Sequence, residues 1–235
     1  MKLPRINPSI AGKGILFWGL ILSTCFLKVS AQTGCVDGNC KDGTGTWKYA
    51  NGNQYTGEFK NYMLNGKGTF TIASGIWAGG TYTGDFKNNK FSGTGTFQYA
   101  NGDVYSGDFE NNKLNGQGVY TYANGDEYTG AWKNNKCEGS GTFTYAAGEY
   151  KGGRYVGEWS NSKMNGNGTF YAADGSVYDG EWVDNTKCGT GTEKYANGSS
   201  YTGEWKNDRF NGQGTFTYPS GKTVTGKWKN NEIQD

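Results

Sequence analysis

Aromatic residues and glycines alternate with polar residues along most of the chain. Residues 105–125, YSGDFENNKLNGQGVYTYANG, have a ring or a glycine at every second position on both sides of a polar segment. Side chains of a strand point alternately to its two faces, so a period of two predicts two β-strands, each with one aromatic and one polar face. The stretch is therefore predicted to be a hairpin.

This hairpin recurs along the chain. Aligned on the first aromatic residue, the copies follow one another at steps of 27, 23, 23, 27, 23 and 23 residues, and a valine follows 23 residues after the last. The aligned residues are Tyr55, Tyr82, Tyr105, Tyr128, Tyr155, Tyr178, Tyr201 and Val224. A fixed period indicates stacked units that contact their neighbours. We expect residues 43–235 to form about seven full repeats with a half-repeat cap at each end.

These patterns predict an all-β fold, an elongated, single-layer antiparallel β-meander that is strongly twisted. Two strands per repeat give an advance of about 10 Å, and the array should be on the order of 70 to 80 Å long. A mid-strand glycine leaves room for a ring to lie over the backbone, and twist brings the rings together as a core. Asn-Gly pairs such as Asn101-Gly102 are expected to form tight two-residue turns, and the Asn-Asn-Lys-x-Asn-Gly segments longer polar turns.

The repeated motif also resembles a known family. Tyr-x-Gly-Glu-Trp-x-Asn-x-x-x-Asn-Gly-x-Gly-Thr-Phe, at a step of 23 residues, is similar to the membrane occupation and recognition nexus (MORN) repeat from residue 43 to about residue 228. The resemblance implies an extended β-sheet used for protein contacts, dimerisation or membrane association. It implies no chemistry by itself. MORN arrays also occur beside catalytic domains, but the repeats here leave no room for one.

Two insertions interrupt the array. Each adds four residues, at residues 75–80 and 148–153, carries one aromatic side chain, Trp77 or Tyr150, and ends in Gly-Gly. Both should project from the same long edge, roughly 30 Å apart. Loops that break a repeat are candidate partner-binding elements, although two taller hairpins left by a duplicated block would give the same pattern.

Single positions also depart from the repeat. Glu193 replaces a ring of the second strand, and Lys187-Cys188 stand where most copies have an apolar residue and asparagine.

The first 31 residues differ from the rest. Three basic residues precede an apolar run at residues 14–27, and small residues end the segment at Ala31. The run is too short for a comfortable membrane span and is typical of a signal peptide, so we expect residues 1–31 to be removed after Ala31 and the protein to be exported. The alternatives are a lipoprotein anchored at Cys25 and an uncleaved N-terminal membrane anchor.

The other four cysteines fit an oxidising compartment. Cys35 and Cys40 lie in a short segment, residues 32–42, and we expect them to form a disulfide bond. Cys137 and Cys188 are two repeats apart, roughly 20 Å, which is too far for a bond between them. The chain has no histidine, and the cysteine spacing does not fit a metal site.

Charge and composition argue against several functions. The 23 basic and 21 acidic residues are interspersed and give a formal charge of +2, so the sequence does not indicate nucleic-acid binding. Catalysis by a Ser-His-Asp or Cys-His site is excluded because histidine is absent. A row of carboxylates is better explained by cross-strand pairing with lysine and threonine than by catalysis. The row consists of Glu58, Asp85, Asp108, Glu158, Glu181 and Glu204.

Three functions remain, and no cofactor is expected for any of them. The leading one is a non-catalytic, secreted or envelope-associated scaffold that binds another protein or itself, with membrane lipid as a further possible partner. The alternative is a module that stacks carbohydrate or lipid on an aromatic row, and the weakest is an enzyme that uses the carboxylates. The candidate aromatic row consists of Phe109, Trp132, Trp159, Trp182 and Trp205.

Overall fold

The computed structural model describes residues 32–235, which contain β-strands and no helix. These residues divide into an N-terminal unit, residues 32–136, and a C-terminal unit, residues 137–235. The predicted cleavage site after Ala31 and the alternative anchor at Cys25 lie outside the described residues.

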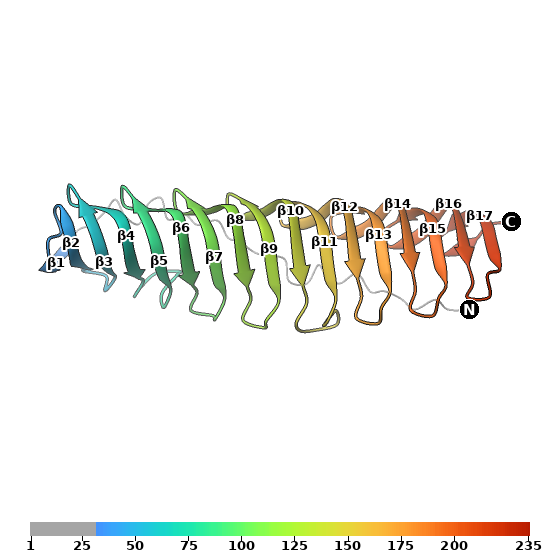
Figure 1. Ribbon diagram of the computed structural model, residues 1–235, viewed down its shortest axis with the longest axis horizontal. Coiled ribbons are helices and arrows are strands. Elements are labelled where there is room, and N and C mark those ends of the chain that lie inside the picture. Colours follow the sequence, from blue (N-terminus) through green and yellow to red (C-terminus); the bar gives the residue numbers. More distant parts are fainter. Residues whose placement is uncertain (1–31) are drawn as a thin grey trace. The chain divides into compact units, whose positions relative to one another are not determined.

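The N-terminal unit is an antiparallel meander in which each strand pairs with its neighbours in the chain (Figure 1). Residues 32–42, predicted to be a short separate segment, add the first strand. The strands are β1 (Gln32–Gly38), β2 (Gly43–Tyr49), β3 (Gln54–Lys60), β4 (Met63–Thr71), β5 (Thr81–Lys87), β6 (Lys90–Gln98), β7 (Val104–Glu110), β8 (Lys113–Thr121) and β9 (Glu127–Lys133).

The C-terminal unit repeats the same pattern of antiparallel neighbours. The predicted all-β fold of consecutive antiparallel hairpins is thus confirmed. The strands are β10 (Lys136–Thr144), β11 (Arg154–Ser160), β12 (Lys163–Tyr171), β13 (Val177–Val183), β14 (Thr186–Lys194), β15 (Ser200–Lys206), β16 (Arg209–Thr217), β17 (Thr223–Lys229) and β18 (Glu232–Ile233).

The two kinds of turn are reversed relative to the sequence-based prediction. Strands β7 and β8 are joined by two residues only, Asn111 and Asn112, whose φ angles are 50° and 67°. Positive φ at both positions is the geometry of a type I′ turn, which matches strand twist and which asparagine tolerates. In the Asn101-Gly102 connection only Gly102 has positive φ, 91°, and its N–H bonds to the Tyr99 carbonyl at 3.0 Å. That connection is the longer one, and the predicted assignment was wrong.

The core is built from the leading tyrosines. Tyr55 is 0% exposed, and its hydroxyl donates to the carbonyl of Glu58 at 2.9 Å, which satisfies the buried polar group. Its ring makes edge contacts with Phe59 on the same strand at 5.0 Å and with Phe86 of the next repeat at 4.8 Å between ring centroids. Tyrosines at the same position in both units, such as Tyr82 with Phe109 and Tyr178 with Trp205, link their own repeat to the following one in the same way.

The mid-strand glycines are required by these rings. A Cβ atom on Gly95 would lie 2.5 Å from the hydroxyl oxygen of Tyr82, and one on Gly84 would lie 2.5 Å from the Cα of Gly95. The close approach predicted from the sequence is therefore present, and it leaves no space for a side chain at these positions.

Candidate functional site

The predicted aromatic row lies in the core. The five rings are between 3% and 6% exposed, and they are Phe109 (4%), Trp132 (3%), Trp159 (6%), Trp182 (3%) and Trp205 (4%). The tryptophan N–H groups are also used inside the fold: that of Trp182 donates to the Gly168 carbonyl at 2.9 Å and that of Trp205 to the Gly191 carbonyl at 3.1 Å. The folded chain therefore does not present these rings for stacking on carbohydrate or lipid.

The first inserted loop folds back onto the N-terminal unit. Trp77 is half-buried, with its ring centroid 5.5 Å from that of Tyr99 and 6.3 Å from that of Phe97. Its Nε1 is buried without a hydrogen-bond partner in the described residues. The residue that projects is Ile76, which is 80% exposed. Trp77 stays a candidate partner-binding residue with only part of its ring accessible.

The second inserted loop has the same construction in the C-terminal unit. Tyr150 is half-buried, and its ring centroid lies 5.5 Å from that of Tyr145 and 6.0 Å from that of Phe170. Burial, and then the charge of Glu149, raise the pKa of Tyr150. Tyr150 stays a candidate on the same terms as Trp77, and the predicted spacing between the two loops stays a prediction.

The row of carboxylates has a structural explanation. In the hairpin of β3 and β4 the register shifts between Gly57 and Phe59, so the opposite strand carries extra residues in a bulge. The Glu58 carboxylate accepts the backbone N–H of Lys67 there at 2.9 Å. Bulge N–H groups are bonded in the same way by Asp85, Asp108, Glu181 and Glu204.

These bonds account for the position of the row better than the predicted pairing with lysine and threonine alone. That pairing occurs as well: Lys67 Nζ lies 2.6 Å from Asp85 Oδ1, and the Thr190 hydroxyl donates to Glu181 at 2.8 Å. The Thr190 backbone N–H, and then its hydroxyl, hold the pKa of Glu181 below its usual value. A carboxylate held ionised as a backbone cap is not set up as a general acid.

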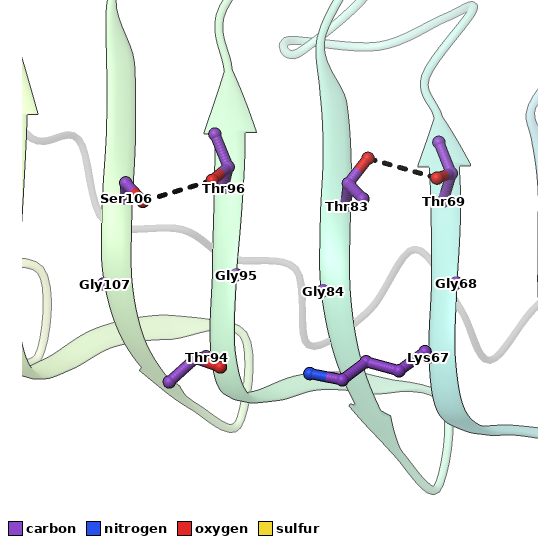
Figure 2. A pocket seen from close by; sticks show the side chains of 10 residues that line it. All are labelled: Lys67, Gly68, Thr69, Thr83, Gly84, Thr94, Gly95, Thr96, Ser106 and Gly107. Atoms are coloured by element: carbon purple, nitrogen blue, oxygen red, sulfur yellow. Dashed lines mark hydrogen bonds between the residues drawn. The ribbon is translucent and has the colours of Figure 1, made fainter.

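The polar face carries an open groove of about 690 Å³ across β4, β5, β6 and β7. Figure 2 shows its floor, a row of mid-strand glycines whose backbone faces the groove. On one side of this row two hydroxyl pairs are hydrogen-bonded, Thr69 with Thr83 at 3.1 Å and Thr96 with Ser106 at 3.2 Å. Lys67 lies on the other side. The groove offers hydroxyl donors and acceptors, and the sequence analysis did not single it out.

The substitutions at positions 187 and 193 form a buried ion pair on β14. Lys187 Nζ lies 2.6 Å from Glu193 Oε1, and both side chains are 4% exposed. The ammonium also lies 4.6 Å from the ring centroid of Tyr178 and 5.1 Å from that of Trp205. Tyr195 donates its hydroxyl to Glu193 Oε2 at 3.0 Å. Lys187 and Glu193 each replace a core residue of the repeat, and they compensate each other on the same strand.

A third charge lies beside this pair. Asp208 occupies a turn position where most repeats have asparagine, and its Oδ1 accepts the Lys187 backbone N–H at 2.8 Å. Its Oδ2 is buried without a hydrogen-bond partner in residues 32–235. Burial raises the pKa of the Asp208 carboxyl above its usual value, although the Lys187 backbone N–H and ammonium act in the opposite direction.

The cysteines follow two patterns. Cys35 and Cys40 are joined in a disulfide bond with their Cα atoms 5.9 Å apart, at the N-terminal end of the first meander. Cys137, which is buried, and Cys188, which is half-buried, form no disulfide bond within residues 32–235. In the described part of the chain no three His, Cys, Asp or Glu residues are grouped so that they could hold a metal ion. Within residues 32–235, no helix has the length and apolar character that crossing a membrane requires.

Comparison with protein families gives one match. The model described as MORN repeat matches seven segments that follow the hairpins, residues 55–76, 82–104, 105–127, 128–154, 155–177, 178–200 and 201–223. No curated protein matches the chain.

Several solved structures are weakly similar. The TCP domain of SAS-4 from Drosophila melanogaster, solved with a proline-rich motif of Ana2, is 14% identical, with 86% of this chain and 95% of that chain covered at a TM-score of 0.38. The TCP10 domain of Danio rerio CPAP is 13% identical, with 79% and 90% covered at a TM-score of 0.26. Virginiamycin B lyase from Staphylococcus aureus is 10% identical, with 84% and 74% covered at a TM-score of 0.17. Such low TM-scores carry no argument about this chain.

Proposed function

Because the chain belongs to the MORN repeat family, we propose that it is an exported, non-catalytic scaffold that binds a partner protein or a second copy of itself. The observation that carries this proposal is the burial of every leading tyrosine and of the rings that pack against it. The aromatic face is buried in the contacts between repeats. The polar face, the hairpin turns and the two inserted loops are what remains for a partner.

The absence of catalysis is part of the proposal. Five of the six carboxylates in the row accept backbone N–H groups of strand bulges. Five regularly repeated caps have the same local role, whereas a catalytic pair needs two carboxylates with different environments in one cleft.

Membrane association is the other mode of binding that the family implies. A carbohydrate- or lipid-binding role for the aromatic row is not favoured, because its five rings are buried. If tryptophan fluorescence nevertheless changed on addition of soluble glycans or lipid vesicles, with the fold unchanged, that alternative would regain support.

Co-purification tests the scaffold proposal. The tagged chain is produced in its native compartment and isolated under gentle conditions. The molar mass of its assemblies is then measured by light scattering. We expect a stoichiometric partner or a defined oligomer. A chain that remains a solitary monomer over its natural concentration range would contradict the proposal. Cleavage after Ala31 is checked on the same sample by mass spectrometry of the N-terminus.

A further inference from the structure

One edge of the N-terminal unit carries a row of lysines next to the two-residue turns. We call it the basic turn edge. The row consists of Lys60, Lys87, Lys90, Lys113 and Lys133, at the ends or beginnings of strands β3, β5, β6, β8 and β9. All are exposed except Lys113, which is half-buried. Each one adjoins a buried core residue in its strand, so its side chain points to the polar face.

These ammonium groups are not neutralised inside the described part of the chain. The ion pairs of Lys67 with Asp85, Lys163 with Asp184, and Lys187 with Glu193 do not involve these five lysines. Lys90 and Lys113 each donate to an asparagine of the following turn, Asn111 at 3.2 Å and Asn134 at 3.0 Å. An ammonium has three donors, so these contacts leave donors free on both lysines.

The row contains an unfavourable contact. Lys87 lies directly opposite Lys90 in the register of β5 and β6, and like charges in that position destabilise a sheet. Two acidic residues lie at this edge. Glu110, opposite Lys113, accepts the side-chain amide of Asn115 at 2.5 Å, and Asp42 accepts the backbone N–H of Asn61, next to Lys60, at 2.9 Å. Two residues further along β3 and β5 lie Glu58 and Asp85, whose carboxylates accept bulge N–H groups. The edge therefore keeps an excess of positive charge.

The equivalent turns of the C-terminal unit carry a smaller excess of positive charge, although Lys206 lies opposite Arg209 there as Lys87 lies opposite Lys90. There, the basic residues at strand ends next to the turns are Lys163, Lys206, Arg209 and Lys229, and the acidic residues at the same turns are Asp184, Asp208 and Glu232. Lys163 is paired with Asp184 at 3.2 Å. The larger excess at the basic turn edge is thus not a requirement of the repeat, because the C-terminal unit folds the same hairpins with a smaller one.

We infer that the basic turn edge is a docking surface for an extended acidic segment of a partner protein. Adjacent strands are about 4.8 Å apart, and side chains on one face of an extended peptide recur about every 6.8 Å. Carboxylates of such a segment can therefore reach successive lysines along the edge. Charge complementarity would also speed encounter and select the partner.

An anionic membrane is the less suitable occupant. Binding in the membrane interface is strengthened by apolar side chains that insert beside the basic ones. At the turns of the N-terminal unit the exposed large apolar side chain is that of Tyr62, at 65%. A line of charges with one exposed ring fits a peptide chain better than a lipid surface.

Charge reversal in two matched positions tests the inference, which rests on the proposed scaffold function. The first variant combines Lys60→Glu, Lys87→Glu and Lys133→Glu, and it spares Lys90 and Lys113, whose ammonium groups donate to turn asparagines. The control combines Lys206→Glu, Arg209→Glu and Lys229→Glu. Both variants of the full chain have the same net charge and the same kind of strand-end position. Binding of a fluorescent poly-L-glutamate peptide is measured by anisotropy at low and at physiological salt.

We expect the first variant to bind the peptide about tenfold more weakly than the unmodified chain, and the control to change less than about twofold. Equal weakening in both variants would overturn the inference, since overall charge alone would then explain binding. So would strong binding to phosphatidylglycerol vesicles with none to the peptide. If a glutamate variant does not melt cooperatively, the corresponding glutamine variants replace it in the same comparison.

The two proposals can fail separately. If the partner isolated from the host binds both variants equally, the scaffold function stands and the basic turn edge is not its docking surface. If no partner or oligomer is found, the scaffold function fails, and the peptide measurement still decides whether the edge is selective for acidic segments.

Discussion

Each leading tyrosine fixes several neighbours of its repeat through one side chain. Its hydroxyl bonds to a carbonyl three residues on, and its ring covers the glycines of two paired strands. For Tyr201, burial and then the charge of Glu204 raise the pKa to about 12, so the hydroxyl stays a donor over the physiological pH range. The repeat therefore depends on a tyrosine and glycines together.

Substitution of one such glycine should be costly. In Gly95→Ala the new Cβ would lie 2.5 Å from the Tyr82 hydroxyl oxygen, and the ring cannot move because it is packed on both sides. We expect a loss of about 3 kcal/mol in the free energy of unfolding, measured by urea titration. The control is Gln98→Ala on the same strand, at an exposed position, which should change stability by less than about 0.5 kcal/mol. Equal effects would contradict the packing explanation.

Asp208 should make the C-terminal unit sensitive to pH. Its folded pKa is raised, so the folded state gains stability when the carboxyl is protonated and loses it as pH rises from the usual aspartate range through the raised value. Asp208→Asn should therefore stabilise the protein at pH 7, by about 1 kcal/mol. The gain should shrink as the pH falls through the raised pKa and should be lost once the pH is below the usual aspartate pKa.

Thermal unfolding of both proteins between acid and neutral pH measures this difference. The control is Asp184→Asn, an exposed carboxylate that is paired with Lys163, and it should show little gain at any pH. A constant difference between Asp208→Asn and the unmodified chain over the whole range would rule out the titration of Asp208 as its cause.

At the scale of single elements, the alternation of rings and polar residues was enough to predict the strands and their buried faces. It was not enough for the turns. The Asn-Gly pairs carry the familiar signal of a two-residue turn, but the register of the strands places that turn at Asn111 and Asn112 and their counterparts. There the side chain of Asn112 accepts the Phe91 backbone N–H at 2.7 Å, a contact with the previous hairpin that local pattern does not reveal.

The candidate site was predictable to a smaller extent for the same reason. The row of Trp132, Trp159 and Trp182 looks alike in sequence whether it faces solvent or the core, and only the packing of successive hairpins decides. The excess of lysine at one edge likewise requires the correct turns to be known, because the side chains gather only after Lys87 and Lys90 are placed opposite each other.

The ion pair within β14 gives a test at this scale. Lys187→Leu leaves Glu193 buried without its partner, and Glu193→Phe does the same to Lys187, so each single change should cost about 3 kcal/mol or more. The double variant has the kinds of residue found in other repeats, and we expect it to be as stable as the unmodified chain or more so. Urea unfolding of the four proteins measures the coupling. Additive losses would show that the two side chains do not depend on each other.

At the scale of the whole molecule, stability should be close to a sum over repeats and their interfaces. In residues 105–127 the chain contains one full repeat, and the register of β6 on β7 is the same as that of β8 on β9, with glycine opposite glycine and ring opposite tyrosine. Removal of these residues would therefore place β9 beside β6 in an equivalent contact.

We expect the protein without residues 105–127 to fold and to unfold cooperatively at a somewhat lower temperature, as followed by circular dichroism. Removal of residues 105–115 alone breaks the alternation of the two strand types and serves as the control, which should not give a native spectrum. If the full deletion behaves like the partial one, the repeats are not equivalent units.

The meander of each unit also has a consequence for how fast the chain can fold. Every strand pairs only with its neighbours in sequence, so β7 needs nothing more distant than β6 and β8 to complete its ladder. All-β proteins are usually slow because distant segments must find one another before any contact is gained, and rates fall as the mean sequence separation of contacts rises. Here loop closure is short at every step. Stopped-flow refolding should therefore be fast for a β-sheet protein of this length, because each hairpin can add to a neighbour that has already folded.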